Sequence, residues 1–422
     1  MKKWMIISLI LLIVGGGLML VGALTAGGLQ STDPYVQQTH TFSGDLTEIH
    51  LIGGSADVLL TEASGSEVEI TTDTPESRPF EFLEGEDGQL HISRKDLRKW
   101  YQRIGVMEFG SRPFNIRIAL PEGFAGDVIL ETASGDISVR SISTDGALTV
   151  SSSSGDLALE HLRLRALTLT SSSGNTRIQA LTCPENVSLR TTSGDLSLTD
   201  AELGGALELS GTSGDIRLSG IRAANAITVK QSSGNLELRD LQCDSLSAVA
   251  SSGSISLEAV VTAGDLHAEA SSGDFTARTV QCSNLNVSAV SGSVRLNAVT
   301  ALGSIAAETS SGDLSGQELE SPSIRCTANS GDIRLTAATT SGLELKTTSG
   351  DITLRETALD GDMTARSTSG DVNVRFSSPA SAFTVTTETT SGSVRVPAGS
   401  YSGDYRMHIS TASGDITVGF TE

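Results

Sequence analysis

The dipeptide Ser-Gly returns at nearly constant intervals along most of the chain, and this recurrence constrains the fold more than any other feature. Successive Ser-Gly glycines are separated by 19 to 22 residues. They are Gly135, Gly155, Gly174, Gly194, Gly214, Gly234, Gly253, Gly273, Gly292, Gly312, Gly331, Gly350, Gly370, Gly392 and Gly414. A period near 20 residues is typical of solenoids, in which each repeat forms one coil and buries its apolar face against neighbouring repeats.

The pattern inside one repeat predicts strands. Leu148 and Val150 alternate with polar residues before Gly155, and Leu157 and Leu159 alternate with them afterwards. Alternation with a period of two on both sides of a glycine predicts two short strands joined at a corner. We therefore predict an all-β fold, a parallel β-solenoid of ~20-residue coils stacked about 4.8 Å apart. Its structural corners include Gly135, Gly155, Gly194, Gly214 and Gly350.

Composition agrees with thin coils and excludes one class of partner. Aromatic residues make up 4% of the 422 residues, while small aliphatic residues raise the hydrophobic fraction to 38%. Stacked Ser and Thr near each corner explain how a narrow coil is filled without large rings. Lys and Arg number 29 against 50 Asp and Glu, a formal net charge of −21. Such a chain lacks the cationic face that nucleic acid binding requires.

The N-terminal residues predict a membrane anchor. Lys2 and Lys3 precede an uncharged stretch that extends to Gln30, longer than the ~20 residues that cross a bilayer as a helix. We expect residues 4–29 to contact the cell membrane as one transmembrane helix, with a cytoplasmic N-terminus and an extracytoplasmic solenoid. A cleaved signal peptide is the alternative. The domains are then the lysines and anchor (1–30), a linker (31–40), degenerate N-terminal coils (41–130) and the regular solenoid (131–422).

One insertion interrupts the degenerate coils. Residues 94–103 concentrate basic and aromatic side chains in an otherwise acidic, aromatic-poor chain. The candidate interaction residues are Arg94, Lys95, Arg98, Lys99, Trp100, Tyr101 and Arg103. They suit contact with anionic headgroups, an envelope polysaccharide or an envelope protein. Alternatively, the segment is an amphipathic cap in which Leu97 and Trp100 cover an open solenoid end, because uncovered ends invite self-association.

These residues resemble a known family. The order is an anchor, strand pairs ending in Ile-Arg-Ile-Ala-Leu-Pro-Glu-Gly at 116–123, and repeated Ser-Gly-Asp-Ile/Leu units. It resembles the putative-adhesin family of bacterial β-strand-repeat proteins over roughly residues 40–422. The resemblance implies an extracytoplasmic β-solenoid linked to adhesion and, in part, to envelope stress. It implies no catalytic residues. The basic-aromatic insertion and the large number of regular coils depart from the family pattern.

Four cysteines are even in number, which in an exported chain suggests disulfides. Cys183, Cys243 and Cys282 each lie nine residues after a corner glycine and therefore share one column. They are two or three coils apart, roughly 10 to 14 Å, which exceeds the ~7 Å limit between bridged Cα atoms. We expect these three and Cys326 to be buried free thiols. The same spacing argues against a zinc site.

Carboxylates stack along the corners. The residue after the corner glycine is usually Asp, and Asn or Ser elsewhere. A stacked acidic column repels itself, so calcium is a weak candidate cofactor. The candidate ligands are Asp136, Asp156, Asp195, Asp215, Asp332, Asp351 and Asp371. Alternatively, Asp stands there for its turn-forming side chain, which Asn and Ser can replace.

No catalytic motif accompanies these features. The sequence contains no Gly-x-Ser-x-Gly, His-Glu-x-x-His or phosphate-binding loop. Our first hypothesis is a non-enzymatic, membrane-anchored adhesin or envelope scaffold that presents a repetitive face to its partner. The alternatives are an envelope-stress sensor that binds a membrane partner and, third, a polysaccharide-active enzyme. The third would be favoured by Asp and Arg clustered in one surface patch, which the sequence alone does not reveal.

Overall fold

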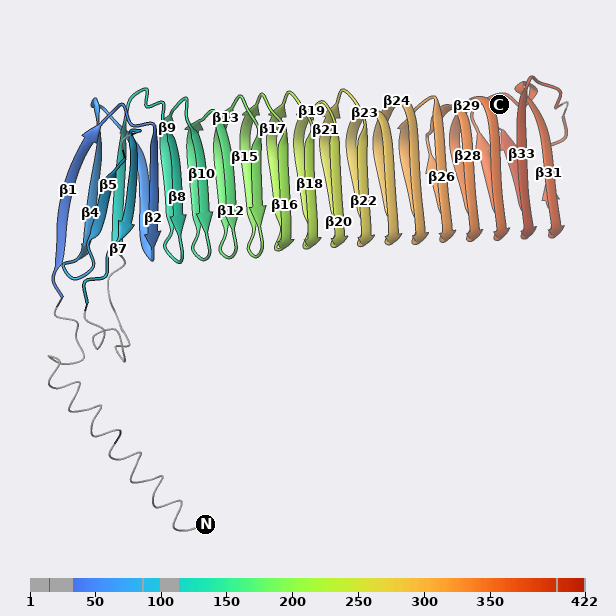
Figure 1. Ribbon diagram of the computed structural model, residues 1–422. Coiled ribbons are helices and arrows are strands. Elements are labelled where there is room, and N and C mark those ends of the chain that lie inside the picture. Colours follow the sequence, from blue (N-terminus) through green and yellow to red (C-terminus); the bar gives the residue numbers. More distant parts are fainter. Residues whose placement is uncertain (1–14, 16–32, 86, 99–113, 400, 421–422) are drawn as a thin grey trace, which may run out of the picture.

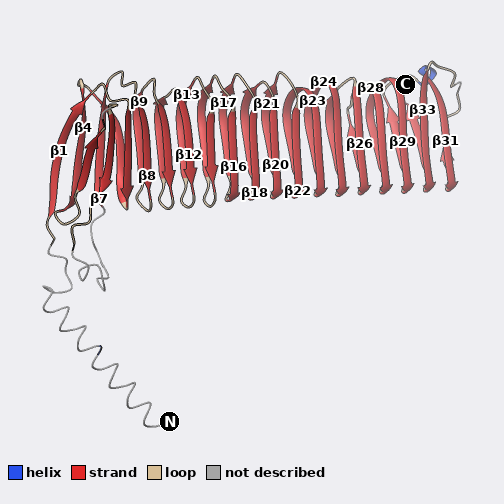
Figure 2. Ribbon diagram, viewed as in Figure 1, coloured by secondary structure: helices blue, strands red, loops and turns tan. Residues whose placement is uncertain are grey.

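The computed structural model describes residue 15 and residues 33–85, 87–98, 114–399 and 401–420. Within them the chain is almost entirely β-strand, and the strands stack side by side along one straight axis (Figure 1, Figure 2). No helix in this part of the chain is long and apolar enough to span a bilayer. Apart from Gly15, the predicted membrane helix lies outside the described residues.

Each regular coil contributes one strand to each of two parallel stacks. The first stack begins with β8 (Asp127–Thr132), β10 (Ala147–Ser152), β12 (Ala166–Ser171), β14 (Val187–Thr191), β16 (Leu207–Ser213), β18 (Ile227–Ser233), β20 (Leu246–Ser252) and β22 (Leu266–Ser272). The second begins with β9 (Ile137–Ser143), β11 (Leu157–Arg163), β13 (Thr176–Cys183), β15 (Leu196–Leu203), β17 (Ile216–Ala223), β19 (Leu236–Cys243) and β21 (Ile255–Thr262).

Both stacks continue in β23 (Phe275–Ser291), β24 (Val294–Ser311), β25 (Leu314–Glu320), β26 (Ser323–Ser330), β27 (Ile333–Thr336), β28 (Thr339–Ser349), β29 (Ile352–Ser369) and β30 (Val372–Phe376). The long strands β23, β24 and β29 each extend through both stacks without a break. Neighbouring coils pair in parallel, with Leu148 opposite Leu167 and Leu157 opposite Thr176. The predicted parallel β-solenoid with ~20-residue coils is confirmed.

The core is a line of small aliphatic side chains between the two stacks. Leu157 and Leu159 are at most 1% exposed, as their alternation predicts. Nearer the corner, the inward residue three before each corner glycine belongs to what we call the hydroxyl column, and Ser152 and Ser171 in it are fully buried. Ser152 and Ser171 donate to the carbonyl two residues ahead, and later members such as Thr309 donate to a corner glycine carbonyl of the adjacent coil. Small hydroxyl side chains therefore close the narrow corner.

The corner requires glycine for two reasons. Gly214 has φ of +98°, in the region that L side chains rarely adopt. In addition, a Cβ on Gly214 would lie 2.3 Å from the Gly194 carbonyl oxygen of the preceding coil, and most other corners show the same approach. Gly135 lacks the positive φ, yet its Cβ would lie 1.8 Å from the Ala56 carbonyl oxygen. Close stacking of backbones therefore explains the recurrence.

A second bend in each coil was not predicted. The residue six positions after the corner glycine has φ between +51° and +67° in most regular coils. Its members are Ser141, His161, Ala180, Asp200, Gly220, Asp240, Ala259, Thr279, Ala298, Glu318, Ala337 and Glu356. In a regular strand, residues three positions apart point to opposite faces. The bend between Leu159 and Leu162 lets both of them point into the core. Because ordinary residues occupy nearly all of these positions, no glycine marks the bend in the sequence.

At the N-terminal end the stack is closed by antiparallel strands. The first coil, β2 (Glu48–Gly54) and β3 (Ala56–Ala63), pairs in parallel with β8 and β9 of the regular array. Outside it lie β6 (Gln89–Arg94) and β7 (Phe114–Pro121). Antiparallel β4 (Glu67–Pro75), β1 (Tyr35–Ser43) and β5 (Phe80–Glu84) complete this end. These strands cover it, and Leu97 is 57% exposed. Trp100, the other residue of the expected cap, lies outside the described residues.

The C-terminal coils stack out of chain order. After β30, the short 3₁₀ helix η2 (Ala380–Ala382) leads to the outermost coil, β31 (Phe383–Ser391) and β32 (Val394–Arg395). The chain then returns to insert β33 (Tyr405–Ser413) and β34 (Ile416–Phe420) beneath it. Phe376, Phe383 and Phe420 pack together there, with ring centroids 5.8 to 6.0 Å apart. The longer 22-residue intervals supply the loops that reach across a coil.

Candidate functional site

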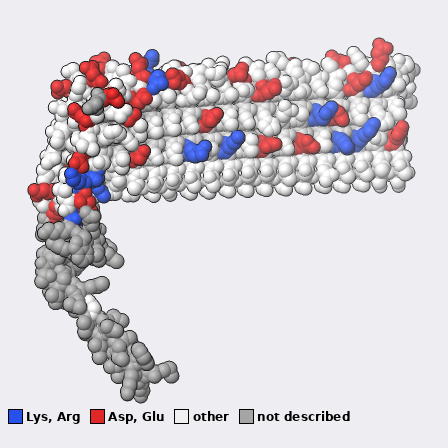
Figure 3. Space-filling model, in the orientation of Figure 1, with Lys and Arg blue, Asp and Glu red and all other residues white. Residues whose placement is uncertain are grey.

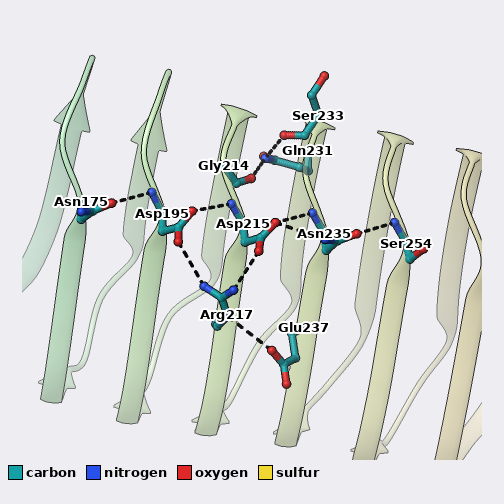
Figure 4. A network of polar contacts seen from close by, with 10 residues as sticks. All are labelled: Asn175, Asp195, Gly214, Asp215, Arg217, Gln231, Ser233, Asn235, Glu237 and Ser254. Carbon is teal, nitrogen blue, oxygen red and sulfur yellow. Dashed lines mark hydrogen bonds and ion pairs between the residues drawn. The ribbon is translucent and has the colours of Figure 1, made fainter.

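The residues after the corner glycines form a hydrogen-bonded ladder along one edge of the rod (Figure 4). The Asp195 N–H donates to Asn175 Oδ1 at 3.1 Å, and the Asp215 N–H donates to Asp195 Oδ1 at 2.9 Å. Asn235 and Ser254 continue the series at 2.9 and 3.0 Å. Each side chain thus accepts the backbone N–H of the next coil. Because the amide oxygen of Asn accepts the same N–H as an Asp carboxylate, Asn replaces Asp without interrupting this ladder.

Arginines offset part of the charge in the ladder. Arg217 lies 3.3 Å from Asp195, 2.8 Å from Asp215 and 3.4 Å from Glu237 (Figure 4). This is the Asp and Arg cluster that the sequence alone did not reveal. Asp195 and Asp215 already accept backbone N–H groups on an exposed edge, and Arg217 does not line the concave surfaces at residues 144–263 or 190–251. The cluster therefore has a structural role and gives no support to a polysaccharide-active enzyme.

Asp274, one residue of the ladder, shows how pairing with an arginine changes the pKa of a carboxyl group. The Arg295 guanidinium, 2.6 Å from Asp274, and the Ser293 N–H hold the pKa of the Asp274 carboxyl below its usual value. A lowered pKa means that the ion pair stabilises the fold above the unfolded-state value near 3.9 and that this contribution is lost as pH falls. Because both side chains are about half exposed, solvent screening keeps the effect small.

The ladder also bears on the calcium prediction. Within the described residues, no group of three or more His, Cys, Asp or Glu side chains is arranged to hold a metal ion. Asp332, Asp351 and Asp371 follow one another directly, with Oδ1 of each of the first two accepting the next N–H at 2.8 Å. Calcium binding by the column stays a prediction.

Asp351→Asn distinguishes the hydrogen bond that this residue accepts from the negative charge that it adds to the column. The amide oxygen keeps the hydrogen bond and removes one of the stacked charges, so we expect unchanged or slightly higher thermal stability at low salt. Asp351→Ala should cost about 1 kcal/mol because the Asp371 N–H loses its acceptor. Thermal unfolding with added calcium and with chelator is the measurement. A calcium-dependent increase in melting temperature that Asp351→Asn abolishes would show that the column binds the ion.

The basic segment is divided by the limits of the described residues. Arg94 donates to Ser55 Oγ at 2.9 Å, and its guanidinium lies 4.7 Å from the Phe114 ring centroid. Lys95 pairs with Glu81 at 2.7 Å, and Arg98 pairs with Asp96 at 3.0 Å. Lys99, Trp100, Tyr101 and Arg103 lie outside the described residues. Arg94 thus contributes to packing at the N-terminal end, while the role of the others in binding stays a prediction.

All four cysteines are free and buried. Cys183, Cys243 and Cys282 occupy one column, as their spacing predicts, since Cys183 stands opposite Leu203 and Cys243 opposite Thr262. Desolvation raises the pKa of the Cys243 thiol to about 12 and that of Cys282 to about 11. Burial also raises the pKa of Cys326 to about 12.

We expect these thiols to resist modification in the folded chain. At pH 8 a thiol reagent should label all four cysteines within minutes in denaturant and far more slowly without it, because the thiolate is the reactive form. Since the folded-state pKa values are raised, the stabilisation is complete below the unfolded value near 8.5 and declines as pH rises toward 11 to 12. Rapid labelling of the native chain would contradict the buried column.

A groove of about 960 Å³ crosses several coils between residues 144 and 263. Its floor is the column that contains Leu164, Cys183, Leu203, Ala223 and Cys243, all at most 8% exposed. Residues that come before the floor residues in each coil form one rim, and residues one or two positions after the floor column form the other. One rim carries Arg163, Thr182, Glu202, Arg222 and Gln242, and the other carries Asp145, Arg165, Glu185 and Asp244.

The groove was not predicted, because its rims come from positions that differ in type from coil to coil. Arg165 is paired with Asp127 at 2.9 Å and with Glu185 at 3.6 Å. The face of the rod in Figure 3 shows how charge is distributed elsewhere: charged side chains form broken lengthwise rows, separated by rows without charge. The rod thus presents long, repetitive surfaces.

Comparisons with known proteins find similar structures and one matching family. A putative cell adhesion protein from Clostridium sporogenes matches over its whole length and 47% of this chain, with 12% identity and a TM-score of 0.27. A putative adhesin from Bacteroides fragilis matches over 99% of its length and 64% of this chain, with 15% identity and a TM-score of 0.31. No curated protein matches the sequence. The Toastrack DUF4097 family matches residues 46–259 and 239–419, and the chain therefore belongs to this family.

Proposed function

We propose that the protein is a non-enzymatic, membrane-anchored adhesin of the cell surface, held by residues 4–29 and extended as a rod outside the membrane. Lys2 and Lys3 before a long uncharged stretch support the orientation. The regular coils support the mechanical role, because their polar corner residues are used in ladder hydrogen bonds. A continuous hydrogen-bonded stack of this kind is stiff and holds its outer surface away from the anchor.

The groove is the observation that carries the adhesive part of this proposal. It runs across the coils, has an apolar floor and polar rims, and is open along its length. Such a shape fits an extended polymer better than a compact small molecule, since successive coils can make similar weak contacts whose effects add. Arg163 and Arg222 project from the same rim, three coils apart, and can donate hydrogen bonds to successive units of an envelope polysaccharide.

Retention on insoluble cell-wall polysaccharide tests this surface. The full chain in mild detergent should cosediment with the polymer, and Arg163→Ser combined with Arg222→Ser should reduce retention several-fold. Arg177→Ser combined with Arg278→Ser is the matched control, because it removes the same charge from exposed positions outside the groove. Equal loss in both pairs would reject the groove as the site. No retention of any form would contradict adhesion to this polymer.

A sensor that binds a membrane protein is the second candidate, and one observation favours it. Asp33 accepts the Ser77 N–H at 3.3 Å, and Ser77 in turn accepts the Leu97 N–H at 2.9 Å. The basic segment therefore begins beside the point where the chain enters the rod from its proposed anchor. A pull-down from membranes, with Lys95, Arg98, Lys99 and Arg103 changed to Ser, tests this. Recovery of one membrane protein that the altered chain loses would favour the sensor.

A further inference from the structure

The coil at the C-terminal end of the rod is less covered than the coils beneath it. Val394 is 43% exposed, whereas Ile416 and Val372, which occupy the same column in the next two coils, are fully buried. Likewise Val385 is partly exposed although its neighbour Met407 is 1% exposed. Among the described residues, no antiparallel strands like those at the other end cover this coil. The core of the rod thus ends on an open coil.

The outermost strand of this coil, β31, also has an unpaired edge. In the described part of the chain it pairs only with β33. The Phe383 and Ser391 carbonyls accept N–H groups from the β33 side, at 3.3 and 2.9 Å. Because backbone direction alternates along a strand, the intervening even-numbered residues direct both N–H and C=O away from the rod. These residues are Thr384, Thr386, Glu388 and Thr390.

We propose that this edge binds the same edge of a second copy of the chain, in an antiparallel two-fold pair with Thr387 on the axis. In this register Thr386 stands opposite Glu388 of the second copy and Thr384 opposite Thr390. Every free residue then exchanges N–H···O bonds in both directions with its counterpart. A two-fold contact closes on itself, so it uses the β31 edge of both copies and yields a dimer at this end of the rod.

Side chains and charge fit the same register. With an odd-numbered residue on the axis, the inward face of one strand continues into the inward face of the other, and Val385 meets Thr389 of the second copy. The strand contains a single charged residue, Glu388, in a chain with a net charge of −21. The register places that carboxylate opposite a threonine, so no like charges face each other.

The pairing would give the proposed adhesin a specific partner. The edge lies at the end of the rod farthest from residue 35, and the two-fold axis places the N-terminal ends of the two copies at opposite ends of the assembly (Figure 1). Rods anchored in two facing membranes would therefore meet end to end. This consequence rests on the proposed membrane anchoring. The pairing itself does not depend on membrane anchoring, because it follows from the unpaired edge of β31 alone.

Charge substitutions on the edge test the register. The full chain in mild detergent should sediment as a two-chain species. Thr386→Glu brings two carboxylates opposite each other at both symmetric positions and should weaken the dimer about tenfold, while Thr386→Lys should strengthen it to a similar degree. Thr364→Glu is the control, because Thr364 and Thr386 share one column, paired through His408, and Thr364 lies within the rod. It should leave the dimer unchanged.

Three outcomes would overturn the pairing. A chain that is monomeric across the accessible concentration range has no such contact. Equal effects of Thr386→Glu and Thr386→Lys would place the contact elsewhere, and species that lengthen with concentration would indicate head-to-tail growth. Thermal unfolding of each variant shows whether it is folded. A normal dimer in a chain that fails to bring cells together would contradict the adhesive role and leave the pairing intact.

Discussion

Gly214→Val should destabilise the middle of the rod by more than about 4 kcal/mol. The substitution adds a side chain to a residue with φ of +98° and places its Cβ 2.3 Å from the Gly194 carbonyl oxygen. That oxygen belongs to the stacked backbone and cannot move aside. Since coils in a solenoid contact only their neighbours, we expect two separate unfolding transitions, one for each side of the altered corner. Calorimetry of the full chain is the measurement.

Gly220→Ala in the same coil is the matched control. Gly220 also has positive φ, at +67°, but the atom nearest to an added Cβ is Asp200 Oδ1 at 2.9 Å, the end of a flexible side chain. Eleven equivalent residues in other coils hold this conformation with side chains. The cost should therefore be about 1 kcal/mol. Unchanged stability of Gly214→Val, or equal losses in the two variants, would contradict the role assigned to the corner glycines.

Gly211→Thr should destabilise the chain by about 3 kcal/mol, and Gln231→Thr should restore most of that loss. Both residues occupy the hydroxyl column, which elsewhere holds Ser, Thr or Ala. A Cβ on Gly211 would lie 1.9 Å from Gln231 Oε1, so the missing side chain makes room for the amide. Gln231 is 3% exposed and donates to the Ser233 carbonyl at 2.7 Å, while its Oε1 has no hydrogen-bond partner.

The paired variant should succeed because threonine already performs this task in other coils. Thr309 and Thr347 donate to the carbonyl of the preceding corner glycine at 3.0 Å, and the Gln231 amide donates to the equivalent Gly214 carbonyl. Threonine at both positions would keep that bond and remove the orphaned Oε1. A double-mutant cycle measures the coupling. Additive losses in the two single variants would show that the residues are independent.

The same pair lies in a shallow depression of about 560 Å³ on the rod surface. Arg190 and Lys230 are at its margin, together with Ser and Thr hydroxyls. The depression follows from the local replacement of Thr by Gly and Gln. It therefore marks an irregularity in the stack, and the paired variant should flatten it without affecting the groove.

Sequence reasoning predicted what depends on period and alternation. The interval between Ser-Gly dipeptides identified the solenoid, and the offset of Cys183, Cys243 and Cys282 from their corners identified a shared column. Both follow because a parallel stack converts equal spacing in sequence into neighbouring positions in space. The family resemblance was confirmed by the match over most of the chain.

Features that depend on departures from the period were missed. The bend at residues such as His161 has no sequence signal, because side chains tolerate it at modest cost. The last two coils stack out of chain order because the loops that join them are long enough to cross a coil. The only sequence signal for this is the longer, 22-residue interval between the last corner glycines. The groove depends on rim residues such as Arg163 and Glu202, whose types vary between coils. The average pattern of the repeat therefore does not predict features that arise from residues differing between coils.

Cells that display the full chain provide the most direct test of the central claim, that the rod is a cell-surface adhesin. Their sedimentation from suspension should be faster than that of cells carrying the anchor segment alone, and Thr386→Glu should slow it if the terminal edge contributes. Protease treatment of intact cells should remove the rod and abolish the effect. Cells that stay dispersed while the rod is demonstrably exposed to protease would contradict the adhesive function and favour the sensor.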